Sequence, residues 1–326
     1  MLKFGTSGIR DITKNLIKDH VATQIAEALS QAGWKEVTVG RDGRTGSDKL
    51  MNEFIKAFTG TVHNLGITTT PDLASQSGLG VMITASHNPS QYCGFKVYLN
   101  HFEQSTLDLP PVPVYHKWDL LPKDIVIDCA NGGLGHKLHS LGFTNIINFD
   151  GEINKNCGAT HPEFLTKYCQ EHQQEIGFSV DGDADRFMMY LHDHVLTSEE
   201  VSVIIATLLN LPSIVVDETV NSGLGNTFNL VRSKVGGQNV IRMMQQSHVN
   251  FGAEKSGHYY FDANIGTSDA LDAIILIANA YHEKGLAGIQ QILKTYHPYF
   301  QFNRNVNIAD LPIDYEVILA NFTLPK

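Results

Sequence analysis

Three carboxylates stand at alternate positions in residues 181–186, which read Asp-Gly-Asp-Ala-Asp-Arg. They follow the apolar stretch 176–180, so we expect them at the end of a buried strand. Like charges at this spacing repel one another unless a cation lies among them. Carboxylate oxygens are hard ligands, and the small spacer residues let the backbone fold around an ion. The sequence therefore predicts a divalent-metal site for Mg²⁺ or Ca²⁺.

Two other interpretations of this acidic loop are weaker. An EF-hand requires Gly at its sixth position and Glu at its twelfth, where this chain has Arg186 and His192. A solvated acidic turn explains neither the apolar residues that precede the loop nor the arginine that directly follows its last aspartate. Arg186 beside a metal indicates an anionic ligand held by both, most simply a phosphate.

A second segment, Gly80–Pro89, places a serine just beyond another short apolar strand. Ser86 is followed by His87 and Asn88, and Pro89 helps to fix the turn. The segment lacks the GxSxG pattern of the α/β-hydrolases, which disfavours a Ser-His-Asp esterase. A serine in this place is by itself more often a turn residue. Beside a phosphate-type metal site, Ser86 becomes a candidate carrier of a phosphoryl group.

A third segment, Phe251–Phe261, encloses a polar cluster between two apolar stretches. Glu254, Lys255, Ser256 and His258 offer donors and acceptors that suit a polyhydroxylated ligand. A hairpin turn without a ligand is the competing interpretation, and the residues alone leave both open.

Short apolar strands that alternate with amphipathic helices predict an α/β fold to position these loops. Helices are expected at residues 18–32, 47–64 (with Ser47 as a cap), 198–210, 269–281 and 286–296. Strands are expected at residues 37–39, 81–83, 95–99, 125–128, 187–191 and 214–216. Prolines at 107–122 interrupt the pattern, and no internal repeat is detected. We expect a first domain at 1–108, a linker at 109–122, a second domain at 123–196, a third at 197–298 and a tail at 299–326.

Composition limits the classes of protein to consider. The chain has 326 residues, a formal net charge of −10 and 42% hydrophobic residues, so it is long enough for two or three domains and unsuited to a general nucleic-acid surface. It contains no run of 18 apolar residues and begins without an apolar signal region. Its four cysteines form no CxxC pair. We therefore expect a cytoplasmic protein that binds neither nucleic acid nor membrane.

Together the segments resemble the α-D-phosphohexomutases, a family that includes phosphomannomutase/phosphoglucomutase and phosphoglucosamine mutase. The resemblance runs from Phe4 to about Tyr296, with the motifs in the family's order. Phe4–Arg10 is similar to the N-terminal signature, Thr84–Pro89 to the phosphoserine loop, Asp181–Arg186 to the metal loop and Glu254–His258 to the sugar-recognition loop. The resemblance implies three consecutive α/β domains with mixed sheets sandwiched by helices, and an active site in the cleft between them.

The resemblance also implies a role for each matched residue. Ser86 would carry a phosphoryl group and pass it to a sugar monophosphate. Mg²⁺ would be held by a phosphate oxygen on Ser86 and by Asp181, Asp183 and Asp185, while Arg186 would contact the phosphoserine. Lys96 matches the proposed general acid/base, with His87 and Arg10 nearby. The substrate contacts expected beyond these are Thr6, Ser7, Lys234, Glu254, Lys255, Ser256 and His258.

The activity so implied interconverts hexose 1-phosphate and hexose 6-phosphate through a hexose 1,6-bisphosphate. The aromatic residues after His258 favour phosphomannomutase/phosphoglucomutase over phosphoglucosamine mutase. Alternatives of another class are a sugar-phosphate phosphatase and a non-catalytic sugar-phosphate-binding protein. An Asp-nucleophile phosphatase is disfavoured, because the Asp-Gly-Asp run lacks the usual following Thr or Val. A homo-oligomer stays open.

The chain also departs from the family pattern. Family members usually carry a fourth domain that binds the non-transferred phosphate, and no matching loop follows Tyr296. We expect a compact form that lacks this domain, with a partner subunit or this chain's own cations supplying the donors, or with mutase activity reduced or lost. Those cations are Arg10, Arg41, Arg44, Lys234 and Lys255. Asp11, Cys93 and Gly237 stand where the family usually has glycine, asparagine and an acidic residue.

Overall fold

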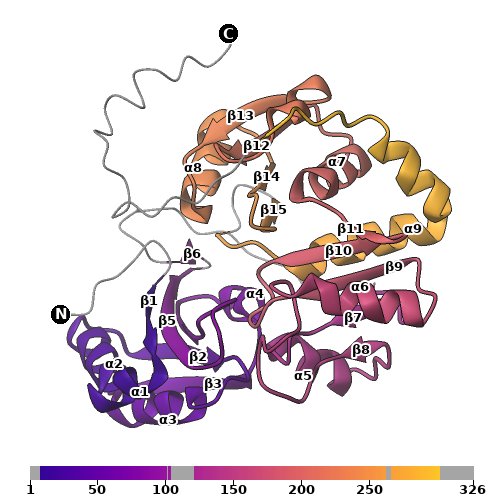
Figure 1. The fold of residues 1–326 in the computed structure, drawn as a ribbon. Coiled ribbons are helices and arrows are strands. Elements are labelled where there is room, and N and C mark those ends of the chain that lie inside the picture. The colour runs from indigo at the N-terminus through magenta and orange to yellow at the C-terminus, as the bar shows by residue number, and fades with distance from the viewer. Residues whose placement is uncertain (1–7, 101, 104–120, 262–265, 302–326) are drawn as a thin grey trace, which may run out of the picture.

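The structure, a computed structural model, describes residues 8–100, 102–103, 121–261 and 266–301. These residues form three α/β units in chain order, each built on one mixed β-sheet with helices against it (Figure 1). The predicted fold class is thereby confirmed. Thr6 and Ser7 lie outside the described residues, as do most of the expected linker at 109–122 and most of the expected tail at 299–326.

The first unit contains the sheet β1-β5-β4-β2-β3, with β6 paired to β5. Its strands are β1 (Ile9–Ile12), β2 (Glu36–Arg41), β3 (Thr61–Ile67), β4 (Leu79–Ile83), β5 (Tyr92–Leu99) and β6 (Phe102–Glu103). Its helices are α1 (Thr13–Lys18), α2 (Val21–Gln31), α3 (Ser47–Ala57) and α4 (Thr70–Ala74).

The second unit contains the sheet β11-β10-β9-β7-β8, and the third contains β13-β12-β14-β15. The second consists of β7 (Val126–Asp128), α5 (Gly133–Ser140), β8 (Ile146–Ile147), α6 (Pro162–Glu171), β9 (Ile176–Val180), β10 (Phe187–Leu191) and β11 (His194–Val195). The third consists of α7 (Ser198–Leu208), β12 (Ser213–Asp217), the 3₁₀ helix η2 (Ser222–Asn226), β13 (Asn229–Ser233), α8 (Gly237–Ser247), β14 (Phe251–Ala253), β15 (Tyr259–Phe261) and α9 (Ala270–Leu293).

One strand arrangement recurs in all three units, although the sequence shows no repeat. In each unit we count strands from a central one (β2, β7 or β12), which is taken as the first. The second and third strands both pair with it in parallel, one on each side. The third strand then pairs antiparallel with the fourth, as β4 does with β5, β9 with β10 and β14 with β15. The three chemically interesting loops are the connections within these antiparallel pairs. They are therefore topologically equivalent.

The units are joined by two different kinds of contact. The second and third share one apolar core, in which Phe178 and Phe187 pack with Phe251 and Tyr259. The first has its own core, around residues such as Phe54. Its contact with the second unit includes a close backbone approach that only glycine permits. A Cβ on Gly133, in the second unit, would lie 2.0 Å from the carbonyl oxygen of Thr68, in the first.

Two local predictions are wrong. The helix expected over residues 47–64 ends at Ala57, and Thr61–Ile67 is strand β3, which pairs in parallel with β2. Gly60 packs against the Lys35 carbonyl, and β-branched residues follow it, so the chain turns back into the sheet. Ser47 is the first helical residue rather than the cap, and its hydroxyl donates to the carbonyls of Asp42 and Arg44.

The helical stretches expected at the C-terminal side are present as α9. Gly285 has a φ of 66°, which interrupts the helix where the sequence predicts a break between two helices. None of the helices in the described part of the chain combines the length and the apolar character that crossing a membrane needs.

Candidate active site

Residues from all three units line one cavity of about 620 Å³. The first unit contributes Gly8, Arg10, Ser86 and His87, and the second contributes Asp185 and Arg186. The third contributes Val235, Gly236, Gly237, Gln238, Ile241, Glu254, Ser256, His258, Tyr260, Gly266, Thr267 and Ser268. The three equivalent loops thus converge on a shared space, which is large enough for a sugar phosphate.

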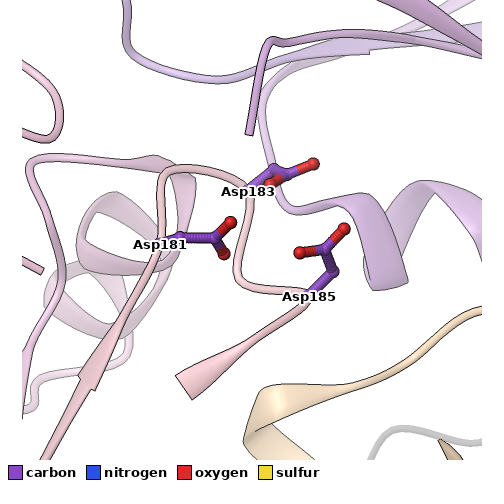
Figure 2. A group of neighbouring side chains, drawn as sticks. All are labelled: Asp181, Asp183 and Asp185. Carbon is purple, nitrogen blue, oxygen red and sulfur yellow. The ribbon is translucent and has the colours of Figure 1, made fainter. Parts of the chain in front are cut away.

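The acidic loop between β9 and β10 gathers its three carboxylates at one point (Figure 2). Oxygens of Asp181, Asp183 and Asp185 lie within 4.8 Å of one another, and all three residues are buried. The loop turns through Ala184, whose φ is 58° and whose amide donates to the Asp181 carbonyl at 3.1 Å. This tight turn is what brings alternate side chains to the same side.

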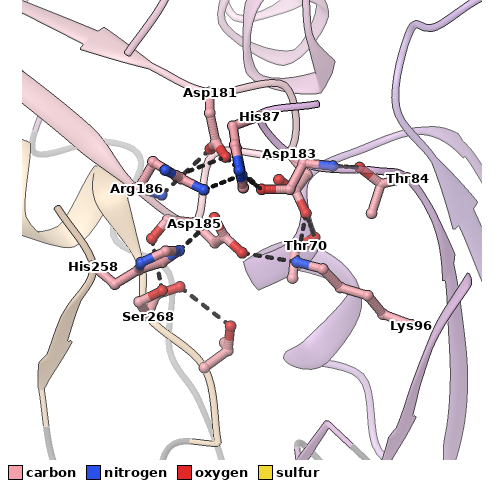
Figure 3. Close-up of polar contacts among 12 residues, drawn as sticks. Thr70, Thr84, His87, Lys96, Asp181, Asp183, Asp185, Arg186, His258 and Ser268 are labelled. Atoms are coloured by element: carbon pink, nitrogen blue, oxygen red, sulfur yellow. Dashed lines mark hydrogen bonds and ion pairs between the residues drawn. The ribbon is translucent and has the colours of Figure 1, made fainter. Parts of the chain in front are cut away.

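Cations surround the three carboxylates (Figure 3). The Lys96 ammonium donates to Asp183 and Asp185, at 2.8 Å in each case. The Arg186 Nε lies 3.2 Å from Asp181, and the His258 Nε2 lies 3.2 Å from Asp185. Thr70, at the start of α4, also donates to Asp183, and its backbone amide donates to the Asp183 carbonyl at 2.9 Å.

The neighbouring cations do not compensate the negative charges of the three carboxylates equally. Burial, together with the charges of Asp185 and Asp183, raises the pKa of Asp181 to about 7. Burial also disfavours the charged form of Asp185, but Lys96 and His258 outweigh it and hold its pKa well below the usual range. Asp181 is therefore the carboxylate whose negative charge is least compensated by its neighbours, and the one that takes up a proton most readily.

The donor set fits a hard divalent cation. The Oδ1 of Asp183 is buried and has no hydrogen-bond partner among the described residues. An unpaired carboxylate oxygen away from water is costly, and a metal ion would satisfy it. Three carboxylates within reach of one point are a ligand set of the kind that Mg²⁺ accepts.

Ser86 lies beside the acidic loop in an uncommon backbone conformation. Its φ is 52°, in the left-handed region, and its side chain is 1% exposed. The hydroxyl donates to Asp181 at 2.7 Å. A residue with a Cβ is disfavoured in this region, so the surrounding structure must hold Ser86 there. The result is an oxygen that faces both the carboxylates and the cavity.

Donors for an anion collect next to the Ser86 hydroxyl. His87 Nδ1 lies 3.4 Å from Ser86 Oγ and contacts an Nη2 of Arg186. Arg10 lines the same cavity, and its Nη1 donates to the Ala85 carbonyl at 3.5 Å. Burial and the charges of Arg186 and Arg10 lower the pKa of His87 to about 4, so the imidazole is neutral at pH 7. Two arginines and a neutral histidine around a serine oxygen can bind a phosphate there.

The loop between β14 and β15 faces this cluster from the third unit. Glu254 accepts from the Gly236 amide at 3.0 Å and from the Tyr260 hydroxyl at 2.7 Å. His258 lies 3.5 Å from Glu254 and bonds to Ser256 at 2.8 Å. Glu254, Ser256 and His258 all line the cavity.

Two of the predicted substrate contacts lie elsewhere. Lys255 extends to Gln301 Oε1 at 3.0 Å and to the Thr219 carbonyl at 3.5 Å. Lys234 is exposed, and neither lysine is among the residues that line the cavity. The other predicted residues in the described range come together around the three loops.

Four buried polar residues lie behind Ser86: Asp42, Arg44, Thr84 and Asn154. Sequence reasoning missed Asp42 and Asn154, and it named Arg44 only as a possible phosphate donor and Thr84 only as the start of the phosphoserine loop. Asp42 and Arg44 directly follow the apolar strand β2, just as the acidic loop follows β9. The same signal, charged residues immediately after a buried strand, could have drawn attention to them. Asn154 carries no such local signal.

Known proteins similar to this chain include several sugar-phosphate mutases. Residues 1–106 match the family model described as "Phosphoglucomutase/phosphomannomutase, alpha/beta/alpha domain I", and residues 183–299 match the corresponding domain III model. The two models together match more than half of the chain. Phosphoglucosamine mutase of Limosilactobacillus reuteri is 27% identical over 94% of this chain and 84% of its own length.

Solved structures show the same fold. A phosphoglucomutase/phosphomannomutase family protein from Burkholderia thailandensis superposes with a TM-score of 0.67 at 19% identity, covering 91% of this chain and 80% of its own. The N-acetylphosphoglucosamine mutase of Aspergillus fumigatus, solved with GlcNAc-6P and magnesium, has a TM-score of 0.59 at 14% identity, with coverage of 91% and 80%.

Proposed function

The chain belongs to the phosphoglucomutase/phosphomannomutase family of the α-D-phosphohexomutase superfamily, and we propose that it interconverts hexose 1-phosphate and hexose 6-phosphate through a phosphoserine and a hexose 1,6-bisphosphate. The relatives are mutases, and the chain is an enzyme of that superfamily. The observation that carries the proposal is Ser86: its hydroxyl lies at the meeting point of the acidic loop, two arginines and the cavity.

The proposed cycle transfers one phosphoryl group in each direction. A sugar hydroxyl loses its proton as it attacks the phosphorus on Ser86, and the bond from phosphorus to Ser86 Oγ breaks. Ser86 Oγ takes up a proton, and the sugar becomes a bisphosphate. The bisphosphate turns over in the cavity, and its other phosphoryl group returns to Ser86. In the intervening state the Ser86 hydroxyl has the Asp181 carboxylate 2.7 Å away as its acceptor. The phosphoryl group passes Arg186 and Arg10, whose charges stabilise its equatorial oxygens.

Asp181, Asp183 and Asp185 would hold Mg²⁺, as their oxygen set and the unpaired Asp183 Oδ1 support. Bound there, the ion supplies positive charge next to the transferring phosphate. The magnesium present with the Aspergillus mutase supports the same choice of metal.

We assign the proton of the attacking hydroxyl to Lys96. The Lys96 Nζ is buried in the acidic loop and lies 2.8 Å from oxygens of both Asp183 and Asp185. To act as a base Lys96 must be neutral, and a Mg²⁺ ion held by the same carboxylates would favour that form, because its charge repels the ammonium. The expected homo-oligomer and the preferred sugar stay predictions.

The sugar is the finer part of the proposal. The aromatic residues after His258 favour glucose and mannose phosphates, whereas the names of the curated relatives, at 25–28% identity, favour glucosamine phosphate. Glu254 and His258 on the cavity wall accept and donate to sugar hydroxyls in either case.

One set of measurements tests the proposal. Intact-mass analysis of the purified protein, before and after exposure to glucose 1,6-bisphosphate, should detect one phosphate that peptide mapping places on Ser86. A coupled isomerisation assay with glucose, mannose and glucosamine phosphates should then give turnover with at least one sugar. Release of inorganic phosphate faster than isomerisation would favour a phosphatase, and binding without turnover would contradict the mutase.

A further inference from the structure

The backbone of Ser86 is held at both ends by one closed ring of hydrogen bonds. Its amide donates to Thr84 Oγ1 at 2.8 Å, and the Thr84 hydroxyl donates to Asp42 Oδ2 at 2.6 Å. Asp42 Oδ2 also accepts from Arg44 Nε at 2.7 Å. The ring closes where Arg44 Nη2 donates to the Ser86 carbonyl at 2.9 Å.

Arg44 has no freedom to make other contacts. It is 1% exposed, and its third side-chain nitrogen, Nη1, donates to the Tyr92 carbonyl on β5 at 2.6 Å. Its planar guanidinium group therefore links the Ser86 carbonyl to Asp42, which follows β2, and to Tyr92 on β5. Lysine, with a single nitrogen, cannot make these three bonds at once.

The other two units show that the fold does not require this arginine. In each unit a buried aspartate follows or ends the central strand and accepts from the amide two residues later: Asp42 from Arg44, Asp128 from Ala130 and Asp217 from Thr219. The other partners of Asp128 are the Asn148 side-chain amide and the Gly158 backbone amide. Those of Asp217 are the Thr219 hydroxyl and the Lys255 backbone amide. Among these three aspartates, only Asp42, in the unit that contains Ser86, accepts a hydrogen bond from an arginine on its carboxylate.

A buried ion pair contributes little net stability compared with an apolar pair of similar volume. What the Asp42–Arg44 pair does provide is a fixed direction for the Ser86 peptide groups. Without it, Ser86 would relax from its φ of 52° towards the right-handed or extended conformations that a residue with a Cβ prefers. The Ser86 hydroxyl would then leave the line between Asp181 and the cavity.

We propose that Asp42, Arg44 and Thr84 are positioning residues that hold Ser86 in its left-handed conformation and so aim its oxygen at the phosphoryl group. The proposal rests on the proposed function, because it takes Ser86 to be the phosphoryl carrier. None of the three lines the cavity, so they act through the Ser86 backbone and not on the sugar.

Thr84→Val and Thr84→Ser form the central pair of variants. At this fully buried position Thr84→Val replaces the hydroxyl with a methyl group, and Thr84→Ser removes the methyl group instead. Only Thr84→Ser therefore keeps the hydroxyl that links the Ser86 amide to Asp42. Thr84→Val should lower kcat roughly 10- to 100-fold with KM within about 3-fold, since a small displacement of a reacting atom has an effect of that size. Thr84→Ser should restore kcat to within about 3-fold of the original protein.

Arg44→Lys and Leu50→Ala separate positioning from general stability. Arg44→Lys keeps the positive charge beside Asp42 but loses the bonds to the Ser86 and Tyr92 carbonyls, so it should reproduce the fall in kcat. Leu50 is fully buried in the apolar core of the first unit and makes none of the hydrogen bonds of the ring. Leu50→Ala should lower Tm at least as much as Thr84→Val does while leaving kcat unchanged at a temperature where both variants are folded.

Two readouts keep this test distinct from that of the mutase itself. The first is the rate at which glucose 1,6-bisphosphate phosphorylates Ser86, followed by intact mass, which needs no isomerisation. The second is a crystal structure of Thr84→Val, in which Ser86 should have left the left-handed region. If Ser86 keeps its φ, or if Thr84→Val and Thr84→Ser have equal kcat, the positioning role is wrong. If the unaltered protein isomerises no hexose phosphate, the proposed function fails while the Ser86 conformation still decides the positioning role.

Discussion

The Ser86 loop and the Glu254 loop occupy equivalent places in the first and third units, yet they are stabilised in opposite ways. Each joins the third strand of its unit to the antiparallel fourth strand, and each is contacted by the aspartate at the end of the central strand. Around Ser86, residues that do not line the cavity hold the loop, and the reactive oxygen has only to bond to Asp181. Around Glu254, the residue that faces the cavity also holds the loop, through Gly236 and Tyr260.

In the Ser86 loop, the residue that reacts is different from the residues that hold the loop in place. In the Glu254 loop, one residue has both roles. A substitution at Ser86 should therefore remove activity and leave the fold intact. A substitution at Glu254 should change sugar binding and loop order together. The acidic loop of the second unit lies between these cases, since its carboxylates bond to Lys96, Thr70 and His258.

Ser86→Ala should have the largest effect on activity. Without the Oγ there is no atom to carry the phosphoryl group, so isomerisation should fall below detection and no phosphate should appear in the intact mass. Tm should change by only a few degrees, because the substitution removes the bond to Asp181 and the 3.4 Å contact with His87 and leaves the backbone ring in place. Retained turnover in this variant would show that the Ser86 loop is not the transferring side of the site.

Asp183→Asn should come next, through the metal. It replaces one of three ligand oxygens and removes a charge that Lys96 also uses, so Mg²⁺ affinity measured by calorimetry should fall more than about 10-fold. Activity should then require correspondingly higher Mg²⁺, and chelator should inactivate the unaltered protein reversibly. Asp124→Asn is a matched control: Asp124 is an exposed acid of the second unit that pairs with His282 at 3.1 Å, and its loss should leave Mg²⁺ affinity unchanged. Equal Mg²⁺ affinities for the Asp183 variant and the unaltered protein would contradict the metal site.

Much of this comparison could be predicted from local sequence, and some could not. The three loops were found because apolar runs end abruptly in polar residues, which marks the ends of buried strands in an α/β fold. The ring behind Ser86 was missed because it joins residues 42 positions apart, and Asn154 reaches the Ser86 carbonyl across 68 positions. The end of α3 was misplaced for a related reason, since β3 is a strand only by virtue of its pairing with β2.

Glu254→Gln should have a smaller effect, divided between KM and stability. A charge-assisted hydrogen bond contributes about 1.5–3 kcal/mol, so the loss of one to a sugar hydroxyl should raise KM about 10-fold or more with a smaller fall in kcat. Tyr260→Phe is the matched control, because it removes the hydroxyl that bonds to Glu254 while keeping the carboxylate itself. If the Tyr260 variant raises KM as much as the Glu254 variant does, the carboxylate serves the loop and not the sugar.

Lys255→Met should have the smallest effect, although the sequence pattern places this lysine among the substrate contacts. Its ammonium bonds to Gln301 and the Thr219 carbonyl. Its backbone amide is what helps to hold the loop, because it donates to Asp217 at 3.0 Å. The substitution keeps that amide and the aliphatic stem, so kcat/KM should change less than about 2-fold, as for most substitutions at partly exposed positions. A loss above about 10-fold would mean that Lys255 turns towards the sugar during the cycle. In that case the Glu254 loop, unlike the Ser86 loop, would be one whose contacts rearrange when substrate binds.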